Sequence, residues 1–183
     1  MAALVGIPAT VTTAAVSAAA AYAGARAQAR GAHRGPVDAI RRQHQRDAYA
    51  AFLEAASTYS YETQWRRNHV QAQAEFPVSG DPGQIERVRQ RARELRLEAA
   101  QLIDPLRRTL PVVQLEGPEY VADLAQDLFR TAIYVLVDAR AAVEDDEDRQ
   151  WGEPRIDQRL ADRITAYTTA ARDYLNGSAA PAA

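Results

Sequence analysis

Apolar residues that recur at alternating spacings of three and four constrain this chain more than any other feature. Three such runs occupy most of the second half of the sequence. This spacing places apolar side chains on one face of an α-helix, and no stretch alternates with a period of two for long enough to indicate a strand. We therefore predict an all-α fold with heptad-like, coiled-coil seams. The runs are Ile85, Val88, Ala92, Leu95, Ala99, Leu102 and Leu106; Val121, Leu124, Leu128, Ala132, Val135, Ala139 and Ala142; and Ile156, Leu160, Ile164, Tyr167, Ala171 and Tyr174.

Prolines and glycines set the expected limits of the helices. Proline is tolerated in the first turn of a helix, whereas inside a helix it removes a hydrogen bond and bends or ends it. We therefore predict a first long helix from Pro36 to about Phe76 and a second from Pro82 to Pro111, in which Pro105 kinks the helix or ends its regular part. A short linker over residues 112–117 should follow.

Two further helices complete the predicted domain. One begins at Pro118 and frays at the acidic run of residues 144–148, and the other ends before Gly177, a residue type that often terminates helices. Short linkers favour antiparallel neighbours. We predict an antiparallel up-and-down four-helix bundle over residues 36–176, followed by a disordered tail over residues 177–183.

The first 24 residues carry no charge and are rich in alanine. A helix of about 20 such residues spans a bilayer core of roughly 30 Å, so we predict a single transmembrane anchor over residues 1–24. Two alternatives stay open. The first is a cleaved signal peptide with Ala21-Tyr22-Ala23 as its cleavage site, although the positive N-terminal region that is usual in signal peptides is missing. The second is a soluble helix buried in an oligomer.

Arginines follow the uncharged segment closely, in and beyond a predicted basic juxtamembrane linker over residues 25–35. Positive residues beside an anchor stay in the cytoplasm, so we expect the bundle at the cytoplasmic face of the cell membrane. The alternative is that these arginines bind anionic lipid or RNA. Small residues four apart within the anchor would also allow a homodimer. The flanking arginines are Arg26, Arg30, Arg34, Arg41 and Arg42.

Five aromatic residues crowd the first predicted bundle helix and are candidates for partner or ligand contact. Large aromatic side chains fill a core, line a ligand pocket between helices or stack on single-stranded nucleic acid. Tyr61 and Trp65 are four residues apart, so they would share a face outside the core. The five residues are Tyr49, Phe52, Tyr59, Tyr61 and Trp65.

Charge and motif content favour no catalytic or metal site. The net charge is −2 and there is no cysteine, so neither bulk nucleic-acid binding nor thiolate chemistry is indicated. His33, His44 and His69 do not pair at helical metal-site spacing. The acidic run of residues 144–148 lacks the spacing of a calcium loop, and we interpret it as a solvated loop or a docking site for a basic partner. We therefore expect no metal and no cofactor.

The predicted second helix carries a strongly charged face. Its arginines include like-charged pairs four residues apart, which we expect to face the acidic helices that follow. The charged face comprises Arg87, Arg89, Arg91, Arg93 and Arg96 together with Glu86, Glu94 and Glu98.

Two stretches resemble a known group of proteins. They are residues 46–53, with the sequence RDAYAAFL, and residues 113–118, with the sequence VQLEGP. With the uncharged N-terminal segment, they are similar to uncharacterised short membrane-anchored helical proteins of actinobacteria, a group without an established activity. This resemblance implies architecture and location but no site residue. The sequence thus favours a non-enzymatic scaffold or protein-interaction module; the alternative is a ligand-sensing bundle with a pocket lined by the aromatic residues.

Overall fold

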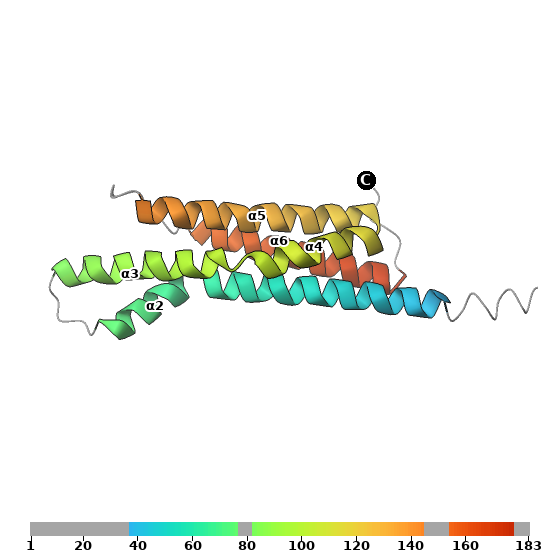
Figure 1. Cartoon of the computed structure of the whole chain (residues 1–183), viewed down its shortest axis with the longest axis horizontal. Helices are drawn as coiled ribbons and strands as arrows, with labels where there is room; N and C mark the ends of the chain where they lie inside the picture. Colours follow the sequence, from blue (N-terminus) through green and yellow to red (C-terminus); the bar gives the residue numbers. More distant parts are fainter. Residues whose placement is uncertain (1–36, 77–81, 145–153, 178–183) are drawn as a thin grey trace, which may run out of the picture. The chain divides into compact units, whose positions relative to one another are not determined.

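A computed structural model describes residues 37–76, 82–144 and 154–177, and all of its regular structure is helical. The predicted all-α class is therefore confirmed for this part of the chain (Figure 1). The chain divides into two units, residues 1–43 and 44–183. Of the first unit, residues 37–43 are helical and exposed. The elements are a helix over residues 37–63, α2 (Trp65–Glu75), α3 (Pro82–Gln101), α4 (Asp104–Glu116), α5 (Glu119–Glu144) and α6 (Pro154–Leu175).

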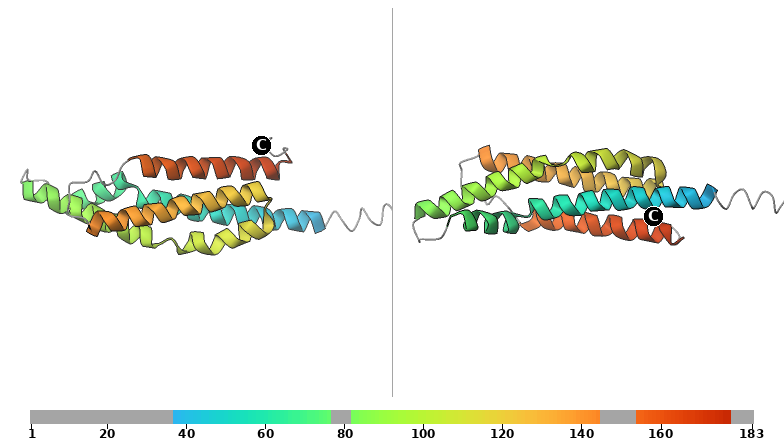
Figure 2. Two further views of the ribbon diagram at one scale, coloured as in Figure 1. Left: turned by 90° about the horizontal axis from the view of Figure 1, so that it is seen from above. Right: turned by 60° about the horizontal axis from the view of Figure 1, so that its bottom comes forward.

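The second unit is a helical bundle in which α5 contacts α3, α4 and α6 and also, through the Tyr59 hydroxyl, the helix over residues 37–63. It packs against α6 on one side, and α3 and α4 follow one another along it (Figures 1 and 2). The predicted apolar run of α5 supplies the middle of the core, because six of its seven residues are buried and Leu124 is half-buried. Each fully buried large apolar side chain contributes about 1.5–3 kcal/mol through removal from water. The periodic pattern therefore located this face correctly.

The predicted first long helix is wrong at Gln64, where the helix over residues 37–63 ends and α2 begins. Gln64 has a ψ of 124°, outside the helical range. Side chains donate hydrogen bonds to backbone carbonyls around the break. The Thr63 hydroxyl donates to the Tyr59 carbonyl at 2.8 Å, and the Asn68 amide donates to the Glu62 and Gln64 carbonyls at 3.0 Å each. No proline or glycine marks this break, so the sequence pattern missed it.

The predicted helix from Pro82 to Pro111 is also two helices, α3 and α4. The break lies at residues 102–103, ahead of the predicted kink, and Pro105 occupies the first turn of α4. Pro105 has no N–H to give the Gln101 carbonyl, and its ring would clash with that carbonyl in a continuous helix. Pro111 lies inside α4, and residues 112–116 are helical rather than a linker. Pro111 is exposed, and it has no N–H to donate to the Arg107 carbonyl.

This break also changes which residue faces the core. Leu102, a member of the predicted seam, is 67 % exposed, whereas the adjacent Ile103 is buried. Ile85 at the other end of the seam is also exposed, at 48 %. The remaining members of the run are buried. A two-residue interruption thus rotates the seam between α3 and α4.

Two glycines have the roles that their positions require. Gly177 has a φ of +75° after the end of α6, as the sequence predicted for a helix-terminating glycine. At the turn between α4 and α5, a Cβ atom on Gly117 would lie 2.8 Å from the Val113 carbonyl oxygen and 2.9 Å from the Tyr49 hydroxyl. Only glycine allows the turn to approach Tyr49 this closely.

Several predictions concern residues outside those that the structure describes. They include the anchor and linker over residues 1–35, with Arg26, Arg30 and Arg34, the acidic loop at residues 145–148, and the tail from residue 178. Within residues 37–76, 82–144 and 154–177, no helix has both the length and the apolar character needed to cross a membrane.

Candidate functional site

A groove of about 660 Å³ lies where α3 breaks into α4, facing the helix over residues 37–63. The break creates the groove, because Leu102 turns outward and Pro105 begins a new helix beside it. This volume falls within the range of about 300–1,000 Å³ that is typical of small-molecule sites. The lining residues are Ala51, Glu54, Ala55, Thr58, Tyr59, Glu62, Ala99, Gln101, Leu102, Asp104, Pro105, Arg108 and Thr109.

The lining of this groove is apolar, with charged side chains at its rim. Much of the rim charge is already neutralised within the protein. Glu62 forms an ion pair with Arg67, and Asp104 pairs with Arg107 at 3.3 Å. Glu54 and Arg108 carry the other two rim charges, of opposite sign. The groove therefore presents apolar surface with little net charge.

Tyr59 contributes a fixed part of the groove wall. It is 3 % exposed, and its hydroxyl lies 3.0 Å from the Ala132 carbonyl oxygen and 3.3 Å from the Ala100 carbonyl oxygen. Burial raises the pKa of Tyr59 well above its ordinary value, so the phenol stays a neutral donor. These contacts connect the helix over residues 37–63 to α3 and α5 directly beside the groove.

The five predicted aromatic residues do not converge on one pocket. Tyr49 and Phe52 are buried, and both rings lie edge-on to Tyr167, at centroid distances of 6.4 and 5.1 Å. Tyr59 alone of the five lines the groove. The first bundle helix thus places three of its aromatic residues in the core.

Tyr61 and Trp65 do not share a helix face, because the break at Gln64 separates them. Tyr61 is exposed, and the Arg67 guanidinium lies 4.8 Å from its ring centroid. Trp65, on α2, stacks on His69 at 6.0 Å and packs against a second, smaller cluster between α2 and α3. The predicted joint contact surface is therefore wrong. Of the basic flank, Arg41 and Arg42 are exposed on the helix over residues 37–63.

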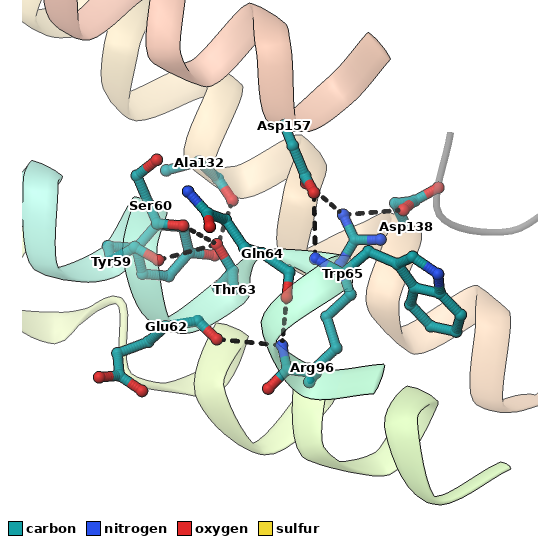
Figure 3. Close-up of polar contacts among 11 residues, drawn as sticks. Tyr59, Ser60, Glu62, Thr63, Gln64, Trp65, Arg96, Ala132, Asp138 and Asp157 are labelled. Carbon is teal, nitrogen blue, oxygen red and sulfur yellow. Dashed lines mark hydrogen bonds and ion pairs between the residues drawn. The ribbon is translucent and has the colours of Figure 1, made fainter. Parts of the chain in front are cut away.

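Sequence reasoning missed the strongest buried ionic contact, at Arg96. The pattern placed Arg96 on the charged face of its helix, yet its side chain is only 2 % exposed. Its Nη2 atom lies 2.9 Å from Asp157 of α6 and 3.6 Å from Asp138 of α5. The second oxygen of Asp157 accepts the Trp65 backbone N–H at 3.1 Å (Figure 3). Arg96 thereby connects α3, α5, α6 and the start of α2.

The other arginines of α3 behave differently from Arg96. We expected them to face the acidic helices that follow, but Arg91 pairs with Glu75 of α2 at 2.8 Å and with Glu94 and Glu98 of its own helix. Arg93 pairs with Glu86, also on α3. One signal could have identified Arg96: it lies four residues from both Ala92 and Ala100, which are fully buried.

The described residues hold no group of three or more histidine, cysteine, aspartate or glutamate side chains placed to bind a metal. His44 is exposed, and His69 lies beside Gln73 on the surface of α2. Comparisons with models of protein families, with curated proteins and with solved structures each give no match. The geometry of the bundle is therefore the basis for inferring function.

Proposed function

We propose that this protein is a non-enzymatic helical bundle that binds a small apolar molecule in the groove at the α3–α4 junction. The observation that carries the proposal is the outward-facing Leu102 beside a groove of about 660 Å³. An exposed leucine at a break between two helices adds apolar surface that an occupant would remove from water. The buried ion pair of Arg96 supports a structural role for the charged residues, because it joins helices and does not line the groove.

A binding site rather than a catalytic site fits the polar groups around the groove. The Tyr59 hydroxyl is held by two backbone carbonyls, and the Thr109 hydroxyl donates to the Pro105 carbonyl at 2.9 Å. No histidine is among the groove residues, and backbone carbonyls accept the hydrogen bonds of both hydroxyls. The remaining surface is mostly methyl and methylene groups. Such a surface favours a ligand held by shape and apolar contact.

We expect a substitution that fills the groove to abolish binding of a neutral apolar dye. Thr58 is exposed at the groove, so Thr58→Trp places an indole in the groove without disturbing the core. Titration of Nile red into the full-length protein, followed by fluorescence, should show binding that Thr58→Trp weakens about tenfold or more, a change of about 1.4 kcal/mol.

The matched control is Thr165→Trp, an exposed helical threonine on α6 that does not line the groove. It should leave the affinity for Nile red unchanged. Equal affinities for the two variants, or no binding to the unmodified protein, would contradict the proposed site.

A second candidate function is a scaffold at the cytoplasmic membrane face. Two observations favour it: the uncharged segment over residues 1–24, and three exposed apolar side chains on α5. Ile133, Tyr134 and Val137 are 38 %, 66 % and 58 % exposed. Val137 lies four residues after Ile133 and three after Tyr134, so the three side chains lie on one side of α5 and form an apolar strip suited to a protein partner.

We expect the full-length protein to sediment with membranes and to require detergent for release. Deletion of residues 2–24 should transfer it to the soluble fraction, because no helix among residues 37–76, 82–144 and 154–177 has a comparable apolar length. Membrane flotation followed by immunoblotting measures both forms. Recovery of the full-length protein in the soluble fraction without detergent would eliminate the anchor from the proposal while leaving the groove untouched.

A further inference from the structure

The chain contains two asparagines, Asn68 and Asn176, and they lie in opposite environments. Asn68 is 1 % exposed, and its side-chain amide donates to the Glu62 and Gln64 carbonyls. Asn176 is exposed just after the end of α6, and its side-chain amide forms no hydrogen bond among residues 37–76, 82–144 and 154–177. The Asn68 side chain is therefore held in place, whereas that of Asn176 is free to react.

The residue that follows each asparagine increases this difference. His69 follows Asn68 inside α2, whereas Gly177 follows Asn176. A backbone nitrogen attacks the side chain of a preceding asparagine most readily when it belongs to glycine, because no Cβ atom then obstructs the approach. A Cβ atom added at Gly177 would meet no described atom within 4 Å beyond its chain neighbours, so the rest of the fold also leaves this position open.

The backbone around Asn176 is held by the last hydrogen bonds of α6. The Asn176 N–H donates to the Arg172 carbonyl at 3.0 Å, and the Gly177 N–H donates to the Tyr174 carbonyl at 3.0 Å. The terminal turn of a helix opens at little cost in free energy, unlike the middle of a packed helix. Opening of this turn releases the Gly177 nitrogen and allows it to reach the Asn176 side chain.

We propose that Asn176 is a site of spontaneous deamidation. The Gly177 nitrogen attacks the Asn176 Cγ atom and forms a new C–N bond, while the bond from Cγ to the side-chain nitrogen breaks. The leaving ammonia takes up the proton that the Gly177 nitrogen loses. Water then opens the resulting succinimide ring at either of its carbonyl carbons, which gives aspartate or isoaspartate. The site is independent of the groove at the α3–α4 junction, so each can fail without the other.

The reaction replaces a neutral amide with a carboxylate at the C-terminal end of α6. The helix dipole places partial negative charge at this end, so the new negative charge is unfavourable there. Isoaspartate also adds a carbon atom to the backbone, which disrupts the hydrogen bonds of the last turn. This turn contains Tyr174, whose hydroxyl accepts a hydrogen bond from Gln45 at 3.2 Å. Deamidation therefore weakens a contact between α6 and the helix over residues 37–63.

Peptide mapping of the full-length protein tests the proposal. Trypsin cleaves after Arg67 and Arg172, so it releases the two asparagines in separate peptides, residues 68–87 and 173–183. The protein is incubated at physiological temperature and mildly alkaline pH, and an aliquot digested without incubation corrects for deamidation during digestion. Chromatography with mass spectrometry should show peptide 173–183 converting to aspartate and isoaspartate forms, while peptide 68–87 stays unchanged.

Two variants of Asn176 separate the reaction from its consequence. Asn176→Gln is the matched control, because glutamine would have to close a larger and less favourable ring, and it should abolish the conversion of peptide 173–183. Asn176→Asp carries the charge of the product from the start. It should lower the melting temperature by roughly 1–4 °C, as expected for an unfavourable charge at a helix end.

The isolated peptide of residues 173–183 gives the rate of deamidation without the helix. If this peptide converts while Asn176 of the intact protein stays unmodified over the same period, the helix end protects the residue and the proposal is wrong. Equal conversion of Asn68 and Asn176 would also overturn it, because exposure and the following glycine would then not select the site. An unchanged melting temperature for Asn176→Asp would refute the proposed weakening of the last turn.

Discussion

Arg96→Ala should lower the free energy of unfolding by about 3–5 kcal/mol, the range found when one partner is removed from a buried ion pair. Arg96 is 2 % exposed and lies 2.9 Å from Asp157. Without the guanidinium, Asp157 loses its ion-pair partner and retains the hydrogen bond from the Trp65 N–H, and Asp138 loses its contact with Arg96. At roughly 2–4 °C per kcal/mol for a chain of this size, thermal denaturation should shift by about 10 °C.

The control for this prediction is another arginine of the same helix. Arg89 is 53 % exposed and lies 3.6 Å from Glu86, one turn away. Exposed pairs of this kind contribute about 0–1 kcal/mol, so Arg89→Ala should hardly change the melting curve. Asp157→Asn then isolates charge from shape, because the amide oxygen can still accept the Trp65 N–H. If Arg96→Ala and Arg89→Ala unfold at the same temperature, the buried role of Arg96 is wrong.

The helices that the sequence predicted best are those whose apolar run is uninterrupted. The run of α5 has no proline or glycine inside it, so one period describes the whole helix, and six of its seven apolar residues are buried. In α6, the predicted end before Gly177 also matches. In both helices, the positions of proline and glycine and the spacing of the apolar residues predict the same helix, and tertiary contacts did not change it.

The breaks were harder to predict because tertiary contacts decide them. At Gln64 no residue type disfavours a helix, and the break is held by the Asn68 side chain and by Asp157, which is 92 residues away from Trp65. A local pattern contains no signal for a partner so distant in sequence. The same reasoning applies to Arg96, whose acceptors lie on two other helices.

The sequence identified Pro105 as a disturbance in its helix, but it did not predict the groove that results from it. Pro105 marked a disturbance in the second predicted helix, but its position did not tell whether the helix would bend or stop. Because it stopped two residues earlier, Ile103 entered the core and Leu102 turned outward. The rings of Tyr167 and Tyr174 in α6 lie edge-on to Tyr49, a pairing that the spacing of either helix alone does not specify.

Leu106→Ala and Leu102→Ala should have opposite consequences, although both leucines belong to one predicted seam. Leu106 is 1 % exposed and Leu102 is 67 % exposed. Truncating a buried leucine removes apolar contacts and leaves a cavity, which costs about 2–5 kcal/mol, whereas an exposed leucine loses little. Urea denaturation should therefore show a much lower midpoint for Leu106→Ala and, for Leu102→Ala, a free energy of unfolding within about 0.5 kcal/mol of that of the unmodified protein.

Binding adds a second readout that distinguishes these two leucines. Leu102 lines the groove, so Leu102→Ala should weaken the binding of Nile red while leaving stability intact. A continuous helix through residues 102–103 would instead bury Leu102 in the seam, and both variants would then unfold at similar urea concentrations. Equal destabilisation would thus refute the break between α3 and α4 and, with it, the groove that the break creates.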